Sequence, residues 1–368
     1  MERMKGIEIY EPGKFRFRND LPVPVPGPGQ VRVRVRAAGI CGTDVHICNG
    51  DPSLAPLLAI PFVLGHEFCG VVDALGPDTP GPAPGTYVSA EMHEWCDACP
   101  ACLAGKFHAC QNTKIHGLNL DGCFAEYLCL PVRNLVVLPS DLPPRGGAIL
   151  DPLGNAVHTA LKVPARGKTV AVLGYGPIGA MTAEVLLFEN ASRIFICDVN
   201  PKALERAGNW VARQGLEDRV EVLDTGGAHD ESIRRILEAT RGGVDIVCEI
   251  SGHPSGINDA FRLVRAAGDV VQLGLPASEV RIRDFGKNIV FKGITIHAVI
   301  GREVFRTWER MLDLHERGFD IPAMVTGEFP LEEFETALRR FASGEEQKVV
   351  LYPDGMPARH TKEVNARR

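Results

Sequence analysis

A continuous apolar run that ends in closely spaced glycines constrains the fold of this chain more than any other feature. The run, residues 169–174, has the length and unbroken apolar character of a strand buried on both faces of a parallel sheet. It leads directly into Gly174-Tyr-Gly176-Pro177-Ile178-Gly179 and then into a segment rich in Ala, Met and Leu, which predicts a helix. In this strand–turn–helix context the glycines let the backbone approach a pyrophosphate, whose charge the helix N-terminus stabilises. Residues 174–179 are therefore predicted to bind a dinucleotide.

An acidic residue at the end of the next expected strand indicates which dinucleotide. This strand, residues 193–198, ends in Asp198, about 20 residues after Gly179. A carboxylate at this place hydrogen-bonds the ribose diol and repels a 2′-phosphate, so NAD is the expected cofactor rather than NADP.

Alternating strands and helices continue beyond Asp198 and predict a doubly wound parallel sheet. We expect strands at 219–223, 244–249, 268–274 and within 288–297, and helices at 231–240, 257–266, 303–317 and 331–341, with a short strand at 348–351.

The first 150 residues have a different character. Short apolar or alternating segments, separated by turns rich in Pro and Gly, predict strands at 7–10, 30–36, 68–73, 87–89 and 121–128. Residues 30–36 alternate strictly between Val and Arg or Gln, which indicates a half-buried strand with one solvated face. Strands so closely spaced argue for a small β-rich domain rather than a parallel sheet.

Four cysteines with short gaps form the most specific metal motif in the sequence. Cys96, Cys99, Cys102 and Cys110 lie within fifteen residues, in the pattern Cys-x2-Cys-x2-Cys-x7-Cys. Two-residue gaps bring successive thiolates to one ion, and the longer loop closes a tetrahedral site. We interpret the motif as a structural zinc site. Iron–sulfur clusters use similar spacings, and unligated cysteines are the remaining alternative.

A second possible metal site combines three kinds of zinc donor. Cys41 follows the strand at 30–36, and His66 and Glu67 follow a proline-rich loop. A catalytic zinc takes three protein ligands and leaves a position for water or substrate, but a single Cys is also commonly a buried apolar residue. Thr43 and His46 lie two and five residues beyond Cys41, a spacing that could pass a proton to solvent. Thr43 could instead cap a helix that begins near Asp44.

Composition narrows the class of protein. The chain has 368 residues, which favours two domains, and a formal net charge of −6 without a basic stripe, which argues against nucleic-acid binding. No run of about 18 apolar residues predicts a membrane span, and the N-terminus lacks the apolar segment of a signal peptide. Eleven cysteines fit reduced thiols and metal ligands better than disulfides. We expect a cytoplasmic protein.

Taken together, these motifs resemble the zinc-dependent medium-chain alcohol dehydrogenases over nearly the whole chain, and most of all their L-threonine 3-dehydrogenase branch. The strings that carry the resemblance are Cys-Gly-Thr-Asp-Val-His-Ile (41–47), Gly-Cys-Phe-Ala-Glu-Tyr-Leu (122–128), Asp-Pro-Leu-Gly-Asn-Ala-Val-His-Thr-Ala-Leu (151–161) and Gly-Arg-Glu-Val-Phe-Arg-Thr-Trp (301–308). The resemblance implies an α/β chain with a GroES-like, β-rich catalytic domain (1–152 and 295–368) and a Rossmann NAD-binding domain (153–294). It also implies a homotetramer.

The resemblance also implies roles for individual residues. Cys41, His66 and Glu67 would hold a catalytic zinc, with Asp151 as a fourth, exchangeable ligand, and the four clustered cysteines would hold a second zinc. Thr43 and His46 would form a proton relay, which replaces the capping interpretation of Thr43. His93 matches a position tied to substrate recognition, although it could be a solvated loop histidine. Arg302 is a candidate for the substrate carboxylate, a cofactor phosphate or a surface ion pair. Ala203 stands where a basic residue is common, and the neighbouring Lys202 could contact the adenosine end instead.

The implied reaction is the NAD-dependent oxidation of the C3 hydroxyl of L-threonine to 2-amino-3-oxobutanoate, a step of threonine catabolism. A polyol or 2,3-butanediol dehydrogenase of the same family is the nearest alternative. A catalytically silent NAD-binding protein on the same fold is a third, and it would hold one zinc per chain instead of two.

Overall fold

The computed structural model describes residues 2–357, and within this range the chain divides into two compact units. The first unit comprises residues 2–99, 111–151 and 320–357. The second comprises residues 100–110 and 152–319. Residues 295–319, which the sequence analysis placed with the β-rich domain, thus group with the parallel sheet.

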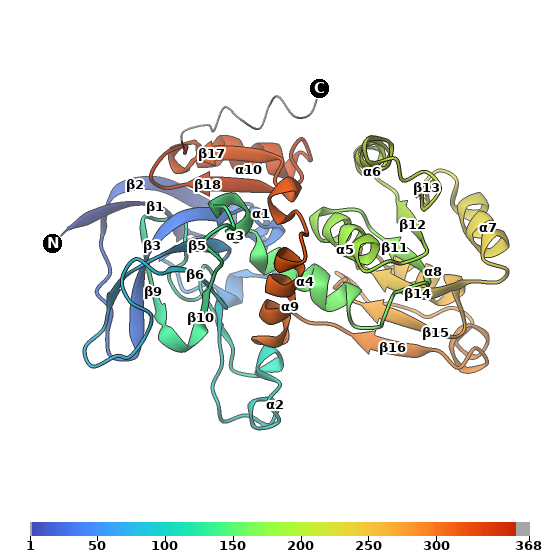
Figure 1. Ribbon diagram of the computed structural model, residues 1–368, viewed down its shortest axis with the longest axis horizontal. Coiled ribbons are helices and arrows are strands. Elements are labelled where there is room, and N and C mark those ends of the chain that lie inside the picture. Colours follow the sequence, from blue (N-terminus) through green and yellow to red (C-terminus); the bar gives the residue numbers. More distant parts are fainter. Residues whose placement is uncertain (1, 358–368) are drawn as a thin grey trace. The chain divides into compact units, whose positions relative to one another are not determined.

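The first unit is built mainly from short antiparallel strands (Figure 1). A three-stranded sheet has the order β2-β1-β4, and a larger sheet has the order β10-β6-β5-β3-β18-β17, with β9 paired to β3. The remaining pair is β7 with β8. The strands are β1 (Arg3–Glu11), β2 (Lys14–Pro22), β3 (Gln30–Gly39), β4 (Phe62–Val63), β5 (Phe68–Leu75), β6 (Tyr87–Ala90), β7 (His93–Glu94), β8 (Lys114–Ile115), β9 (Tyr127–Pro131), β10 (Leu135–Val137), β17 (Gly327–Pro330) and β18 (Val349–Tyr352).

Strand β3 is central because its sequence alternates. Val31, Val33 and Val35 are fully buried in the core of the first unit. The intervening arginines lie on the other face, where Arg32 pairs with Asp73 at 2.6 Å and Arg34 pairs with Asp354 at 3.0 Å. The half-buried strand predicted from the period-two pattern is confirmed, and it carries the chain directly to Cys41.

Short helices connect and cover these strands. Two of them, α1 and α10, pack against each other. The helices of this unit are α1 (Gly42–Cys48), α3 (Pro144–Gly147) and α10 (Phe334–Ala342), and its 3₁₀ helices are η1 (Ala55–Leu57), η3 (Val132–Asn134), η5 (Ile321–Met324) and η6 (Leu331–Glu333). Helix α2 (Pro100–Leu103), the 3₁₀ helix η2 (Phe107–Ala109) and most of α4 (Leu150–Ala160) group with the second unit.

The second unit contains a six-stranded sheet in which every neighbouring pair is parallel. Its strand order, β13-β12-β11-β14-β15-β16, reverses direction at β11, as in a doubly wound dinucleotide-binding fold (Figure 1). The fold class predicted from the alternating segments is confirmed. The strands are β11 (Thr169–Leu173), β12 (Arg193–Asp198), β13 (Val220–Asp224), β14 (Val244–Glu249), β15 (Val264–Gln272) and β16 (Thr295–Ala298).

Helices pack along this sheet. Helix α5 packs on β11 and β12, α6 on β12 and β13, and α8 on β14 and β15. No helix within residues 2–357 is long and apolar enough to cross a membrane. The helices are α5 (Pro177–Phe188), α6 (Pro201–Gln214), α7 (His229–Ala239), α8 (Pro254–Leu263) and α9 (Arg306–Glu316), with the π-helix η4 (Gly286–Val290).

Three segments differ from the sequence-based expectation. Residues 264–266, expected at the end of a helix, begin strand β15, where Val264 pairs with Val244. Residues 288–290, expected in a strand, belong to the π-helix, because Asn288 bonds back to Asp284 O and Arg283 O instead of to a neighbouring strand. Short apolar segments are ambiguous between the two states, and tertiary contacts decided both cases.

The third difference lies at residues 121–126, which the sequence assigned to a strand. These residues bond to the loop before β5 in an irregular pattern, with Gly122 N on Val63 O and Cys123 N on Gly65 O. The regular strand β9 begins only at Tyr127.

Asp245 ties three strands of the parallel sheet together. Its carboxylate accepts hydrogen bonds from Thr169 N at 2.8 Å and Thr169 Oγ1 at 2.9 Å on β11, and from Arg265 Nε at 2.7 Å on β15. Burial opposes ionisation, but these donors outweigh it and lower the pKa of Asp245 below its ordinary value.

We predict that Asp245→Ala destabilises the protein by about 2 kcal/mol at pH 7, because three hydrogen bonds to a charged acceptor are lost. The folded-state pKa is lowered, so this contribution is present above the ordinary value of 3.8 and is lost as the pH falls through the lowered pKa. Urea unfolding of wild type and variant at pH 7 and at pH values below 3.8 measures the difference.

The exposed Asp218→Ala in the same unit serves as the control and should leave stability nearly unchanged. A difference between Asp245→Ala and wild type that is independent of pH would contradict the assignment.

Candidate active site and cofactor site

Cys41, His66 and Glu67 come together from two segments of the first unit. Cys41 follows β3 and precedes α1, whereas His66 and Glu67 lie between β4 and β5. The sulfur, a ring nitrogen and a carboxylate oxygen of these residues all lie within 4.8 Å of one another. Gly65 allows this turn, because it has a φ of +95° and a Cβ on it would overlap the ring of Phe124.

The environment of this group fits a cation. Within the described residues, His66 Nδ1 and Glu67 Oε1 are buried and make no hydrogen bond. The buried carboxylates of Asp44 and Asp151 lie close enough to act on His66 electrostatically. Burial raises the pKa of Asp44 to about 6. Burial alone would lower the pKa of His66, but Asp44 and Cys41 raise it to about 10. Such an excess of acidic groups, with sulfur, nitrogen and oxygen donors, is suited to zinc.

Asp151, the predicted fourth ligand, stands in the first turn of α4 and is buried. Its carboxylate is among the groups that raise the pKa of His66. It does not belong to the set of three donors that lie within 4.8 Å of one another. The structure therefore brings Asp151 near His66 but outside the closest group.

Lys348, which contacts Glu67, is a residue of this group that the sequence analysis missed. Its ammonium forms a short ion pair with Glu67 Oε2 and donates to Ile40 O at 2.8 Å, and both side chains of the pair are buried. Lys348 immediately precedes the apolar strand β18, where a lysine usually marks the solvated end of a strand. No local signal in the sequence distinguishes this buried lysine from an exposed one.

The proposed proton relay residues, Thr43 and His46, both lie within α1, and His46 stands in its last turn. The helix begins at Gly42 with Cys41 as its N-cap, and Asp44 Oδ2 accepts Cys41 N at 2.8 Å. Thr43 is therefore inside the helix and is not its N-cap, and its Oγ1 lies 3.8 Å from Cys41 Sγ. His46 has 63% of its side chain exposed, and its Nδ1 lies 2.9 Å from Asp51 Oδ2. Thr43 thus lies beside Cys41, and His46 faces solvent.

His93 is held by two residues that the sequence analysis did not single out. Its Nδ1 lies 2.6 Å from Oε1 of the buried Glu91. The amide of buried Asn134 donates to Glu91 O at 2.6 Å and to His93 O at 3.0 Å. The protein therefore fixes the orientation of the His93 ring, which is not expected of a solvated loop histidine.

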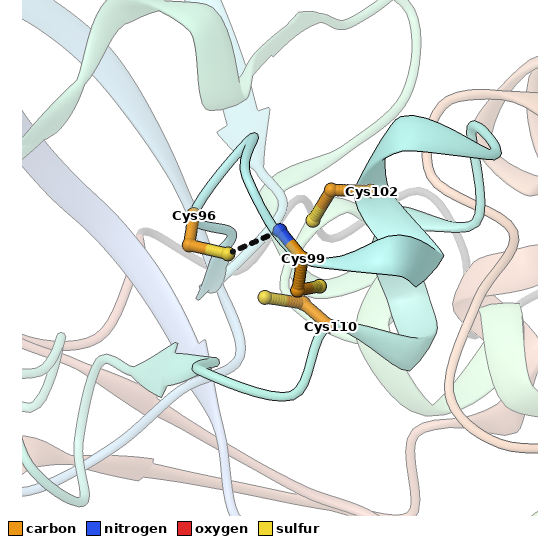
Figure 2. A group of neighbouring side chains, drawn as sticks. All are labelled: Cys96, Cys99, Cys102 and Cys110. Carbon is orange, nitrogen blue, oxygen red and sulfur yellow. Dashed lines mark hydrogen bonds between the residues drawn. The ribbon is translucent and has the colours of Figure 1, made fainter.

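The four clustered cysteines meet at one point, as Figure 2 shows. Their sulfurs all lie within 4.8 Å of one another, and Cys96 Sγ accepts Cys99 N at 3.4 Å and Asn112 Nδ2 at 3.5 Å. N–H groups directed at a sulfur, here one from the backbone and one from a side-chain amide, favour the thiolate. Four thiolates at such a distance fit a closed tetrahedral metal site, which stabilises a loop and leaves no position for substrate.

The glycine-rich turn lies in the second unit at the end of β11. Gly174 has a φ of +96°, and a Cβ on Gly179 would overlap Gly174 O. Gly176 is the N-cap of α5, which starts with Pro177 and Ile178. The N–H groups of the first helical turn therefore face the turn, where they can bind a phosphate.

Asp198, at the end of β12, holds the glycine turn in place. Its Oδ2 accepts Tyr175 N at 2.6 Å, and its Oδ1 accepts Val199 N at 2.7 Å and Asn200 N at 2.8 Å. Lys202 stands in the first turn of α6, where its N donates to Asn200 Oδ1 at 2.9 Å. A cavity of about 270 Å³ at the carboxyl ends of the strands is lined by Gly174, Asp198, Thr225, Ser251 and His253.

Arg302 is buried in the second unit, with only 2% of its surface exposed. Its Nη1 lies 3.4 Å from Asn155 Oδ1, and its side chain occupies the space that a Cβ on Gly154 would need. His158 Nδ1 lies 2.9 Å from the carbonyl of neighbouring Gly301. Because Arg302 is buried, it does not form the surface ion pair that the sequence analysis considered. Its burial is compatible with contact to a ligand anion.

Comparison with known proteins identifies relatives of both units. Residues 27–140 match the alcohol dehydrogenase GroES-like domain, and residues 177–317 match the zinc-binding dehydrogenase domain. The chain is 40% identical to an L-threonine 3-dehydrogenase from Bacillus subtilis, over 86% of this chain and 89% of that protein. It is 36% identical to an L-threonine 3-dehydrogenase from Symbiobacterium thermophilum, over 96% and 99% of the two chains.

Solved structures with the same fold include enzymes with other names. A zinc-binding dehydrogenase from Sinorhizobium meliloti, bound to NADP, superimposes with a TM-score of 0.82 at 28% identity, over 96% of this chain and 100% of that chain. The 2R,3R-butanediol dehydrogenase from Bacillus subtilis superimposes with a TM-score of 0.83 at 25% identity, over 95% and 99%.

We predict that Lys348→Met lowers the free energy of unfolding by about 3–5 kcal/mol, because it leaves the carboxylate of Glu67 buried without its partner. Urea unfolding at pH 7 measures the loss. The double variant Glu67→Gln/Lys348→Met should recover part of it, because no uncompensated charge remains.

Lys114→Met, which changes an exposed lysine of the same unit, is the matched control. A Lys348→Met protein whose stability lies within about 0.5 kcal/mol of wild type would show that the buried pair is not important for folding.

Proposed function

Because this chain belongs to the zinc-binding alcohol dehydrogenase family, we propose that it oxidises the C3 hydroxyl of L-threonine with NAD, giving 2-amino-3-oxobutanoate. The observation that carries the proposal is the convergence of Cys41, His66 and Glu67 in a buried, acidic group. The substrate assignment is supported by L-threonine 3-dehydrogenases that are 36–40% identical over most of the chain.

Two zinc ions per chain fit the two groups of donors. Cys41, His66 and Glu67 would hold the catalytic ion, with Asp151 available as an exchangeable ligand, and the four clustered cysteines would hold the structural ion. When bound, the catalytic zinc supplies a Lewis acid that lowers the pKa of the substrate hydroxyl. Lys348 pairs with Glu67 Oε2, so Glu67 Oε1, which makes no hydrogen bond within the described residues, is the oxygen that would be available to hold the ion.

The chain's own residues would handle the proton. Thr43 Oγ1, beside Cys41, accepts the hydroxyl proton and passes it to His46, whose largely exposed ring releases it to solvent. Asp51 at His46 Nδ1 fixes the ring and directs Nε2 away from Asp51.

The dinucleotide would lie across the carboxyl ends of the parallel strands. The turn at Gly174–Gly179 and the first turn of α5 bind the pyrophosphate, and Asp198 accepts the adenosine ribose hydroxyls. A negative charge at this position disfavours a 2′-phosphate, which supports NAD rather than NADP. Lys202, in the first turn of the following helix, is a further contact for the adenosine end.

The amino-acid substrate needs partners for its carboxylate and ammonium groups. His93, whose ring Glu91 orients, is the candidate in the first unit, and Arg302 is the candidate in the second. A guanidinium binds a carboxylate through two parallel hydrogen bonds, which a neutral diol does not require.

A 2,3-butanediol dehydrogenase is the second candidate function, because an enzyme of that name has the same fold at 25% identity. The zinc and hydride chemistry would be the same, and only the substrate contacts would differ.

We expect initial rates of NADH formation to be at least about tenfold higher with L-threonine than with the same concentration of 2,3-butanediol, because anion-binding side chains discriminate against neutral diols. Absorbance at the NADH band under matched conditions measures both rates. A preference for the diol would overturn the substrate assignment and leave the metal and cofactor sites standing.

We also predict that Cys102→Ser lowers the zinc content from two ions per chain to one, because a structural site with three thiolates holds the ion weakly. Metal analysis of the purified protein measures this, and Cys129→Ser, outside both groups, is the control. A Cys102→Ser protein that keeps two zinc ions would contradict the assignment of the cluster.

We further infer a cytoplasmic homotetramer. None of the eleven cysteines, all of which lie within residues 2–357, forms a disulfide, which suits a reducing compartment. Strand β16 is an edge strand, and Ile296 on it and the nearby Phe291 are 47% and 88% exposed. An apolar edge of this kind favours pairing with the same strand of a second subunit.

A further inference from the structure

His116 is a buried histidine that the proposed mechanism does not use, and it belongs to neither group of metal donors. It directly follows β8, the strand that pairs with β7. Its ring Nδ1 lies 2.8 Å from Asp121 O, and its Nε2 lies 3.0 Å from Glu94 Oε1. A carbonyl and a carboxylate are both acceptors, so the ring satisfies the two contacts only when both nitrogens carry a hydrogen. The two partners therefore hold the ring in one orientation.

His116 bonds to the residues on both sides of His93. Its backbone N donates to Met92 O at 3.0 Å, and its ring bonds to Glu94. These two bonds enclose the backbone of His93 and fix its position on β7. The contact between His93 Nδ1 and Glu91 fixes the ring. The place of the His93 side chain thus depends on His116 as well as on Glu91.

The other side of His116 connects to a loop that packs against Val63 and Gly65. Asp121, whose carbonyl faces the His116 ring, accepts Val63 N on its Oδ1 at 2.9 Å. Gly122 N donates to Val63 O at 2.7 Å. A Cβ on Gly122 would overlap Gly65 O, so the two backbones are in direct contact. The loop is therefore fixed against this turn.

The turn at Gly65 leads directly to His66 and Glu67, two of the proposed zinc ligands. A continuous series of contacts thus runs from the strand that carries His93, through His116 and the loop, to the residue beside these ligands. Every residue in the series belongs to the first unit. The series determines where His93 lies relative to the two ligands.

We propose that His116 is a positioning residue, which holds His93 at a fixed place relative to His66 and Glu67. It acts through its contacts on β7 and on the loop at Asp121, and it does not itself contact the substrate. The inference rests on the role proposed above for His93 as a contact of the amino-acid substrate. A neutral side chain with a single donor group can serve only one of the two acceptors that face the His116 ring.

Steady-state kinetics of His116→Gln with L-threonine test the proposal. We expect the KM for L-threonine to rise about tenfold, because a hydrogen bond to a charged group is lost and the substrate contact shifts. We expect kcat to change by less than about twofold, because a contact made equally with the substrate and the transition state affects KM alone. Metal analysis verifies that the variant keeps the zinc content of the wild-type protein.

The same substitution in a His93→Ala background shows whether His116 acts through His93. We expect no further change in KM there, because the residue that His116 positions is gone. A purely structural role would affect both backgrounds alike.

Glu335→Gln, an exposed substitution in the same unit, is the control and should leave KM unchanged. Glu94→Gln keeps an acceptor oxygen for the His116 ring but removes the charge, so it is the milder variant if His116→Gln folds poorly. It should raise the KM for L-threonine about threefold.

An unchanged KM in both His116→Gln and Glu94→Gln would overturn the positioning role, and so would an equal rise in KM with and without His93. A His93→Ala protein with the KM of the wild type would overturn the proposed substrate contact and the inference that depends on it. Because His93→Ala is also measured on its own, the two failures are distinguished. A wild-type protein that does not oxidise L-threonine would overturn the proposed function, and the inference with it.

Discussion

The buried ion pair between Glu67 and Lys348 is the interaction on which the first unit depends. It joins residues 281 positions apart in the sequence. It lies close to the end of β3, just before Cys41 in the chain. Strand β18, which Lys348 precedes, runs antiparallel to β3, and Ile40 N donates to Val349 O at 2.9 Å. The C-terminal strand is therefore part of the N-terminal sheet, and the lysine that precedes it balances the charge of Glu67. A buried carboxylate with one oxygen paired and the other directed at a cation needs both partners.

In the second unit, too, acidic side chains hold separate segments together, and here they stand at the ends of parallel strands. Asp198 after β12 and Glu249 at the end of β14 each accept several N–H or O–H donors from the loops that follow. Loops at the carboxyl ends of such a sheet form the ligand crevice, and they need fixed shapes to bind a cofactor. Each carboxylate accepts hydrogen bonds from loop N–H groups that have no strand partner. The sheet therefore supplies the position of the crevice, and the acids supply its detailed geometry.

Features encoded by local spacing could be predicted from the sequence. The parallel sheet, the turn at Gly174–Gly179 and the clustering of Cys96 to Cys110 follow from residues that are neighbours in the chain, and the structure places them together. The roles proposed for these site residues remain predictions. Cys41, His66 and Glu67 come together over a longer separation, and the resemblance to known enzymes rather than their spacing made that grouping specific.

Other parts of the site depend on contacts that leave no local pattern. Lys348 and Glu91 are charged residues that look solvated in sequence, and only the folded chain shows that both are buried. Residues 264–266 were misassigned as helix for a related reason, because their pairing with β14 outweighs a local preference. In each case a tertiary partner decided the outcome, and a single sequence does not identify that partner.

The most direct test of the central claim is to follow the hydrogen at C3 of the substrate. The chain would be supplied with NAD and L-threonine deuterated at C3, and the deuterium content of the NADH formed would be measured by mass spectrometry. Direct hydride transfer from C3 predicts that each NADH carries one deuterium. NADH without deuterium, or no NADH from threonine while another alcohol is oxidised, would contradict the proposed reaction.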